Sequence, residues 1–114
     1  MAKRRMISVD VLGTDKYVRL PFSSQAMYIQ MILNADDDGF VDNVESIARV
    51  LGIERRYYRE LVKSGLIIEF NSGVAVIADW CRMNKVRVDR YIRTDYTEEF
   101  KSLTTDEKDR YIKA

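Results

Sequence analysis

The segment Asn34–Glu45, which reads NADDDGFVDNVE, has the residue types and spacing of a calcium-binding loop. The EF-hand loop places oxygen ligands at fixed intervals around a glycine that allows a sharp turn. The residues at the corresponding positions here are Asn34, Asp36, Asp38, Asp42 and Glu45, with Gly39 at the turn. Coordination of Ca²⁺ is therefore one chemistry that this segment could perform.

Two features of the loop weaken that interpretation. Asn34 replaces the usual first aspartate, which removes one negative charge from a cation site, and the sequence contains no second loop to form a pair. The same residues also make a reasonable turn without metal, because Gly39 can adopt a positive φ and Asp42 or Asn43 can cap a following helix. We favour the metal-free turn and keep calcium as an alternative, with the ligands Asn34, Asp36, Asp38 and Glu45.

Side chains for other common site chemistries are missing. The chain has no histidine and one cysteine, Cys81, which excludes histidine-based zinc sites, Ser-His-Asp triads and an internal disulfide. It has no glycine-rich phosphate-binding motif. The acids of residues 36–45 could hold Mg²⁺ for nuclease chemistry, but no lysine lies nearby in the sequence to assist. The sequence therefore predicts a protein that is not an enzyme and needs no cofactor, with Cys81 as an inert thiol.

Charge is divided into blocks, although the net charge is only +1. Residues 36–45 carry five acidic groups and no basic group. Residues 54–63 carry four basic and two acidic groups, and residues 82–93 carry five basic groups against one acidic group. Blocks of this kind predict a molecule with one positive side, which suits a polyanionic partner.

Hydrophobic periodicity predicts three helices that would have to position these charges. Residues 24–35 are apolar nearly all round, with Ser23 as the N-cap and a staple between Phe22 and Met27. A second helix ends at Leu51, before Gly52. The third helix, residues 54–64, buries a stripe of Tyr58, Leu61 and Val62 and turns its basic side chains outward.

The remaining segments predict short strands and turns. Phe40-Val41 is a short strand, and residues 66–70 and 74–80 form a hairpin across the turn Asn71-Ser72-Gly73. Residues 7–12 suit either a strand or a helix. The chain is irregular from Cys81, and Thr104 with Glu107 is the capping box of a last short helix.

This order of elements is typical of an α+β winged helix-turn-helix, with a three-helix core, a β-hairpin wing and extensions at both ends. Residues 1–96 would form the domain and residues 97–114 a C-terminal tail or the start of a linker. A helix fits the major groove of B-DNA, and arginine is the best donor to phosphates and guanine edges. The predicted DNA contacts on the third helix and at the wing tip are Arg55, Arg56, Arg59, Lys63, Asn71 and Ser72.

Residues 82–93 interleave basic and apolar side chains. One interpretation is an arm that runs along DNA phosphates through Lys85, Arg87 and Arg90. The other is a segment that docks on the core through its valines and leaves the cations in water. The role of Tyr57 is also open, since its ring could stack on a base or compete with Tyr58 for a place in the core.

Several motifs together resemble the N-terminal domain of the phage replisome organiser family, which is related to the DnaD-like primosomal proteins. They are MISVDVL, LPFSSQAMY, NADDDGFV, SGVAVIADW and the N-x5-RY pattern from Asn84 to Tyr91, and they cover about residues 1–96. The resemblance implies a winged-helix domain of a replication-initiation protein that binds double-stranded DNA, with a helicase or helicase loader as partner and a tendency to self-associate. It also implies a longer C-terminal region, so that this chain would be a fragment.

The alternative function is a winged helix that contacts proteins, either another copy of itself or the helicase loader. That function predicts an exposed apolar patch among Ile7, Val9, Val11, Val18 and Phe100. The sequence has no signal peptide and no apolar run long enough to span a bilayer, which predicts a cytoplasmic protein without membrane contact.

Overall fold

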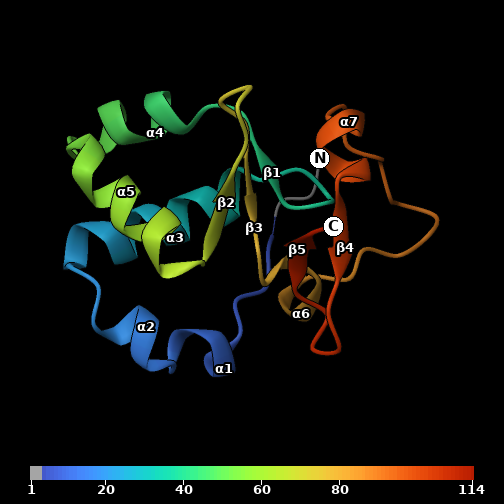
Figure 1. Ribbon diagram of the computed structural model, residues 1–114, viewed down its shortest axis with the longest axis horizontal. Coiled ribbons are helices and arrows are strands. Elements are labelled where there is room, and N and C mark those ends of the chain that lie inside the picture. The colour runs from blue at the N-terminus through green and yellow to red at the C-terminus, as the bar shows by residue number, and fades with distance from the viewer. Residues whose placement is uncertain (1–3) are drawn as a thin grey trace.

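Three helices gather on one side of a small antiparallel sheet in the computed structural model, which describes residues 4–114 (Figure 1). The C-terminal elements lie on the other side of that sheet. In chain order the elements are α1 (Val9–Leu12), α2 (Asp15–Val18), α3 (Phe22–Asn34), β1 (Phe40–Val41), α4 (Val44–Leu51), α5 (Arg55–Ser64), β2 (Ile67–Glu69), β3 (Ala75–Ile77), α6 (Trp80–Met83), α7 (Thr97–Lys101), β4 (Leu103–Thr105) and β5 (Tyr111–Lys113). The α+β class is thereby confirmed.

Helix α3 supplies the centre of the core through one face. Met27, Tyr28, Met31 and Ile32 have no exposed surface, whereas Leu33 is exposed. The helix is therefore apolar nearly all round but buried through one face only. The predicted N-cap and staple are wrong, because the helix begins at Phe22, which is 87% exposed.

Residues 7–12, for which strand and helix were both open, form the short helix α1. Ser8 caps this helix, since its hydroxyl accepts the backbone N–H of Asp10.

The sheet has the strand order β1-β3-β2. Phe40 pairs with Val76 in one antiparallel ladder, and Ile68 pairs with Val76 in the other. The predicted hairpin and its third strand are thereby confirmed. The hairpin is shorter than predicted, because Trp80 begins helix α6 instead of ending a strand.

Helices α4 and α5 meet at a tight turn around Gly52. Gly52 and Gly65 both adopt left-handed backbone conformations at helix C-termini, as predicted for glycine in these positions. On α5, Tyr58 and Leu61 are buried against the core, and the basic residues face outward. The N-terminus of α4 differs from expectation, because neither Asp42 nor Asn43 makes a side-chain capping bond.

Residues 97–114 pack on the sheet, so the expected tail is part of the folded structure. The ring of Phe100 lies edge-on to Phe40, 6.0 Å between centroids, and Tyr111 is buried beside the same ring. The backbone N–H of Tyr111 donates to Ala78 O at 2.8 Å. The capping box predicted at Thr104 is wrong, since Thr104 lies in β4 and pairs with Ile112. No helix in the described part of the chain is long and apolar enough to cross a bilayer.

Candidate nucleic-acid interface and acidic loop

Helix α5 turns its three arginines into solvent. The exposed fractions of the Arg55, Arg56 and Arg59 side chains are 54%, 68% and 47%, and Lys63 one turn later is also exposed. The helical spacing of these basic residues directs them outward, because Tyr58 and Leu61 occupy the buried face of the helix. The predicted outward face of the third helix is therefore present.

Each of these arginines is paired with a glutamate of the same chain. Arg55 Nη1 lies 3.0 Å from Glu45, Arg56 Nε lies 3.2 Å from Glu54, and Arg59 Nη1 lies 2.7 Å from Glu69. Sequence reasoning missed these pairs, because Glu45 and Glu69 come from α4 and β2. The pairs reduce the positive potential that α5 presents to a polyanion.

Tyr57 is half-buried and lies under an arginine, which answers the question left open by the sequence. The Arg56 guanidinium carbon is 4.6 Å from the centre of the Tyr57 ring, and Tyr58 instead takes the core position. The hydroxyl of Tyr57 also accepts a hydrogen bond from Arg56 Nη2 at 2.8 Å. This contact holds the Arg56 side chain in place and uses one face of the ring.

Glu69 connects α5 to the hairpin. Partial burial acts to raise the pKa of the Glu69 carboxyl, but the neighbouring Tyr58 hydroxyl and the Arg59 guanidinium outweigh it and hold the pKa below its usual value. Glu69 therefore stays ionised at neutral pH and competes with any phosphate for Arg59. A pocket of about 350 Å³ lies between α4, α5 and the hairpin, lined by Arg55, Tyr58 and Glu69 among others.

The hairpin tip is exposed as predicted. Asn71, Ser72 and Gly73 are all open to solvent, and the tip lies at the top of the molecule in Figure 1. The Ser72 hydroxyl donates to Glu99 of α7 at 2.8 Å. This bond ties the tip to the C-terminal segment and places an acidic side chain beside it.

The basic residues 85–90 do not join this surface. Lys85, Arg87 and Arg90 are exposed, and Arg87 pairs with Asp89 at 3.3 Å. They belong to the connection between α6 and α7, which lies at the right of Figure 1, whereas α5 lies at the left. The expectation of one continuous positive side through α5, the wing and residues 82–93 is therefore wrong. The C-terminal half of that connection docks on the acidic loop.

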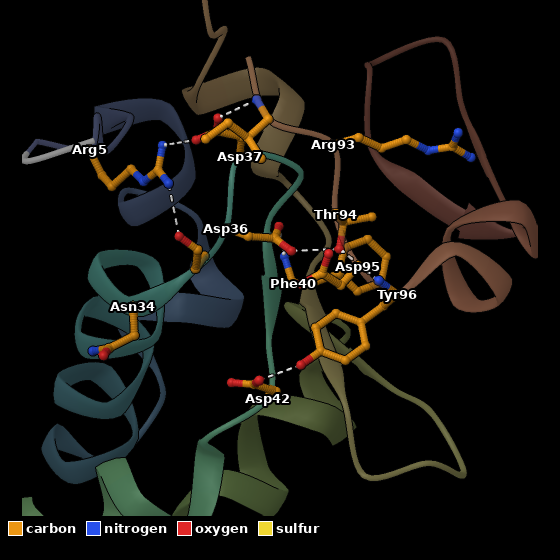
Figure 2. A pocket seen from close by; sticks show the side chains of 12 residues that line it. Arg5, Asn34, Asp36, Asp37, Phe40, Asp42, Arg93, Thr94, Asp95 and Tyr96 are labelled. Atoms are coloured by element: carbon orange, nitrogen blue, oxygen red, sulfur yellow. Dashed lines mark hydrogen bonds and ion pairs between the residues drawn. The ribbon is translucent and has the colours of Figure 1, made fainter. Parts of the chain in front are cut away.

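Figure 2 shows the acidic loop with the side chains that surround it. One Asp36 carboxylate oxygen accepts the backbone N–H groups of Asp38 and Phe40 at 2.9 and 3.0 Å, which closes the turn. The other oxygen accepts the Thr94 hydroxyl at 2.5 Å. Asp36 thus fixes both the turn and a residue distant in the sequence.

Asp37 and Asp38 hold further parts of the chain. The Asp37 carboxylate accepts Arg5 at 3.1 Å and the backbone N–H of Ile92 at 2.9 Å. The Asp38 carboxylate accepts the Tyr91 hydroxyl at 2.6 Å and the backbone N–H of Thr94 at 2.9 Å. Backbone carbonyls of the loop also accept the Trp80 indole N–H and the Tyr111 hydroxyl. The loop is therefore an anchor for the N-terminal and C-terminal segments.

Asp42 completes this arrangement by accepting the Tyr96 hydroxyl. That hydrogen bond, together with burial, raises the pKa of Tyr96 to about 12. A pocket of about 280 Å³ lies between the loop and residues 92–96, and Arg93 extends away from the loop beside it (Figure 2).

The four predicted calcium ligands are not brought together. Asp36 and Asp38 accept hydrogen bonds from residues 91–94, the Asn34 amide donates to Gln30 O, and Glu45 pairs with Arg55. Within residues 4–114 no group of three or more acidic or thiol side chains is arranged to hold a metal ion. The EF-hand arrangement is therefore wrong for this loop.

A scan against protein-family models, a search of curated proteins and a search of solved structures each found no match to this chain. The resemblance to phage replisome organisers thus stays a prediction carried by the sequence motifs alone.

Proposed function

We propose that this chain is a double-stranded DNA-binding domain with a winged-helix fold, in which α5 is the recognition helix and the β2–β3 hairpin is the wing. The observation that carries the proposal is the outward row of Arg55, Arg56, Arg59 and Lys63 on a helix whose opposite face is buried. A helix of this width enters the major groove, and its arginines reach base edges or flanking phosphates.

The intramolecular ion pairs set the expected strength of binding. DNA has to replace Glu45, Glu54 and Glu69 as partners of the three arginines. Exposed ion pairs of this kind contribute about 0–1 kcal/mol each, so a phosphate can displace them at moderate cost. We therefore propose DNA binding that is modest at physiological salt and that strengthens steeply as salt is lowered.

The resemblance to phage replisome organisers supports a role in replication initiation. The domain would bind origin DNA, and a helicase or helicase loader would be its protein partner. These roles rest on the motifs of the sequence and extend beyond the contacts described above.

Fluorescence anisotropy with a random-sequence duplex at two salt concentrations tests the DNA proposal. The test variant changes Arg55, Arg56 and Arg59 to alanine. The matched control changes Lys85, Arg87 and Arg90 to alanine, which removes the same charge from the opposite end of the molecule.

We expect the α5 variant to bind DNA far more weakly and to flatten the slope of log affinity against log salt. The slope should fall by roughly 0.9 for each phosphate that the variant no longer neutralises. The control variant should bind nearly as well as the wild type. Equal weakening in both variants would contradict a specific role for α5, because net charge alone would then account for the binding.

A protein-interaction module remains the second candidate, and one observation favours it. Val9, Val18 and Phe22 are 84%, 60% and 87% exposed on α1, α2 and the first turn of α3. Of the predicted apolar patch, Val11 is buried and Phe100 packs on the core, so only part of that patch is exposed. Sedimentation equilibrium of the wild type and of a Val9→Asp, Val18→Asp variant separates the two functions. Self-association that the variant abolishes supports the module, and a monomer at all concentrations excludes self-association.

A further inference from the structure

The pocket between the acidic loop and residues 92–96 takes no part in the proposed DNA interface, and its walls have a distinct chemistry. Its volume is about 280 Å³, which suits a single side chain better than a large cofactor. Part of the wall is apolar and is formed by Ala35, Phe40, Ile92 and Tyr96. The Phe40 ring is 2% exposed, and its centroid lies 6.2 Å from that of the Tyr96 ring, so packing fixes this wall. A ligand with an apolar body fits against it.

The charged residues that line the pocket are mostly acidic. They are the carboxylates Asp36, Asp37, Asp42 and Asp95 and the guanidinium groups Arg5 and Arg93, which leaves an excess of two negative charges. Arg5 is paired with Asp37, and the Arg93 side chain extends away from the loop (Figure 2). Within residues 4–114 no basic side chain lies at ion-pair distance from Asp42 or Asp95. The C-terminal end of α3, the negative end of its dipole, also borders the pocket. A cationic ligand is therefore favoured.

A buried donor on the pocket wall lacks an acceptor. The Arg5 side chain is 5% exposed, and its two terminal nitrogens donate to Asp37 Oδ1 and Ala35 O at 3.1 and 2.9 Å. Its Nε is also buried but has no hydrogen-bond partner in the described residues. An unpaired buried donor costs about 1–3 kcal/mol, so an occupant that offers an acceptor there gains affinity. The pocket therefore suits a ligand that carries an acceptor as well as a positive charge.

We propose that this pocket binds a basic segment of a partner protein, with one arginine or lysine side chain inside the cavity. The methylene stem of that side chain packs against Phe40 and Tyr96, and its charge is attracted by Asp42 and Asp95. The Tyr96 ring adds a cation–π contact. The backbone carbonyls of the segment supply the acceptor that Arg5 Nε lacks.

Two other kinds of occupant fit the pocket less well. A nucleic-acid phosphate would be repelled by the excess of negative charge. A metal ion needs several oxygen ligands, and within residues 4–114 no group of three or more acidic or thiol side chains is arranged to hold one. A basic peptide matches the apolar wall, the negative charge and the buried donor together. The site goes beyond the proposed DNA function and does not depend on it.

The test uses the whole chain and two short capped peptides as probes, one with an arginine between alanines and one with glutamine in place of the arginine. NMR follows the backbone amides of Asp42 and Tyr96 and the Nε–Hε group of Arg5. The test variant combines Asp42→Asn with Asp95→Asn, and the new amide oxygen at position 42 can still accept the Tyr96 hydroxyl. The matched control combines Asp10→Asn with Glu107→Gln, two exposed carboxylates without an ion pair in the described part of the chain.

We expect the arginine peptide to give saturable shifts of all three signals. Its affinity should fall about tenfold in the test variant, because two exposed ion pairs are lost. The control variant should bind as the wild type does, and the glutamine peptide should bind far more weakly.

The absence of saturable shifts, an unchanged Arg5 signal or equal weakening in both variants would overturn the proposal. Self-association of the wild type that the test variant abolishes would also overturn it, because a second copy of the chain would then be the occupant. None of these changes touches α5, so failure here is distinguishable from failure of the DNA proposal.

Discussion

Replacing Gly39 by alanine should destabilise the protein strongly, because two separate effects act at this position. Gly39 has a φ of 90°, a conformation that costs a residue with a Cβ about 1–2 kcal/mol. A Cβ at Gly39 would also lie 2.5 Å from Cγ of Trp80. Trp80 is 1% exposed, and its indole N–H donates to Asp37 O at 2.9 Å, so it cannot move without losing packing and that bond.

The expected magnitude follows from adding these effects. Overpacking in a core costs about 1–3 kcal/mol, which gives a total of roughly 2–5 kcal/mol with the backbone contribution. Small domains have about 5–15 kcal/mol of total stability, and 1 kcal/mol lowers the Tm of a domain of this size by roughly 4 °C. We therefore expect Gly39→Ala to lower the Tm by about 8–20 °C, measured by circular dichroism.

Gly73→Ala is the matched control for the backbone effect. Gly73 has nearly the same φ, 89°, but a Cβ there would meet nothing within 4 Å. Its Tm should fall by only about 4–8 °C, the backbone contribution alone. Equal Tm values for the two variants would refute the reasoning, because the contact between the acidic loop and Trp80 would then contribute nothing.

Three further predictions concern α5 and the acidic loop. Glu69→Gln should strengthen binding of a random duplex about two- to fivefold at low salt, because the change frees Arg59. The gain in affinity should vanish at high salt. Unchanged affinity in fluorescence anisotropy would argue against competition by Glu69. Tyr91→Phe removes a donor from the buried Asp38 carboxylate, at a cost of about 1–3 kcal/mol. Hydrogen exchange at Ile92 and Thr94 should then accelerate while α3 stays protected, and unchanged exchange would contradict the anchoring role of the loop. Millimolar Ca²⁺ should leave the Tm unchanged within about 1 °C, because the loop carboxylates already accept hydrogen bonds from donors of the protein. A clear rise in Tm would restore the calcium interpretation.

The local elements were predictable because their causes are local. The inner stripe of α5, the glycine turns at Gly52 and Gly65, and the hairpin around Asn71–Gly73 follow from periodicity and turn chemistry within a few residues. The predicted ends of the helices and strands were less accurate. Trp80 continues a β-rich run in the sequence but begins helix α6, and its side chain packs against Gly39.

The long-range contacts were not predictable from periodicity. The donors to the Asp36, Asp37 and Asp38 carboxylates lie more than 50 residues away in the chain, apart from Arg5 and the turn itself. The acidic run could be recognised as unusual, but its spacing was equally compatible with a metal. One available signal was the group of hydroxyl side chains Tyr91, Thr94 and Tyr96, at the C-terminal end of the basic segment 82–93 and just beyond it.

Several of the motifs that carry the family resemblance have structural roles here. The Asn84 side chain makes two hydrogen bonds to the backbone of Met6, and Tyr91 binds Asp38. Gly39 and Trp80, from two other motifs, are in contact. These motifs therefore hold the terminal segments on the core. The DNA proposal depends instead on the basic residues of α5.

The most direct test of that proposal is a map of backbone amide chemical shifts on addition of duplex DNA. We expect the largest changes to fall in α5, from Arg55 to Lys63, and at the tip Asn71–Gly73, with residues 85–90 much less affected. Saturable binding that leaves α5 and the tip unchanged would contradict the proposed interface.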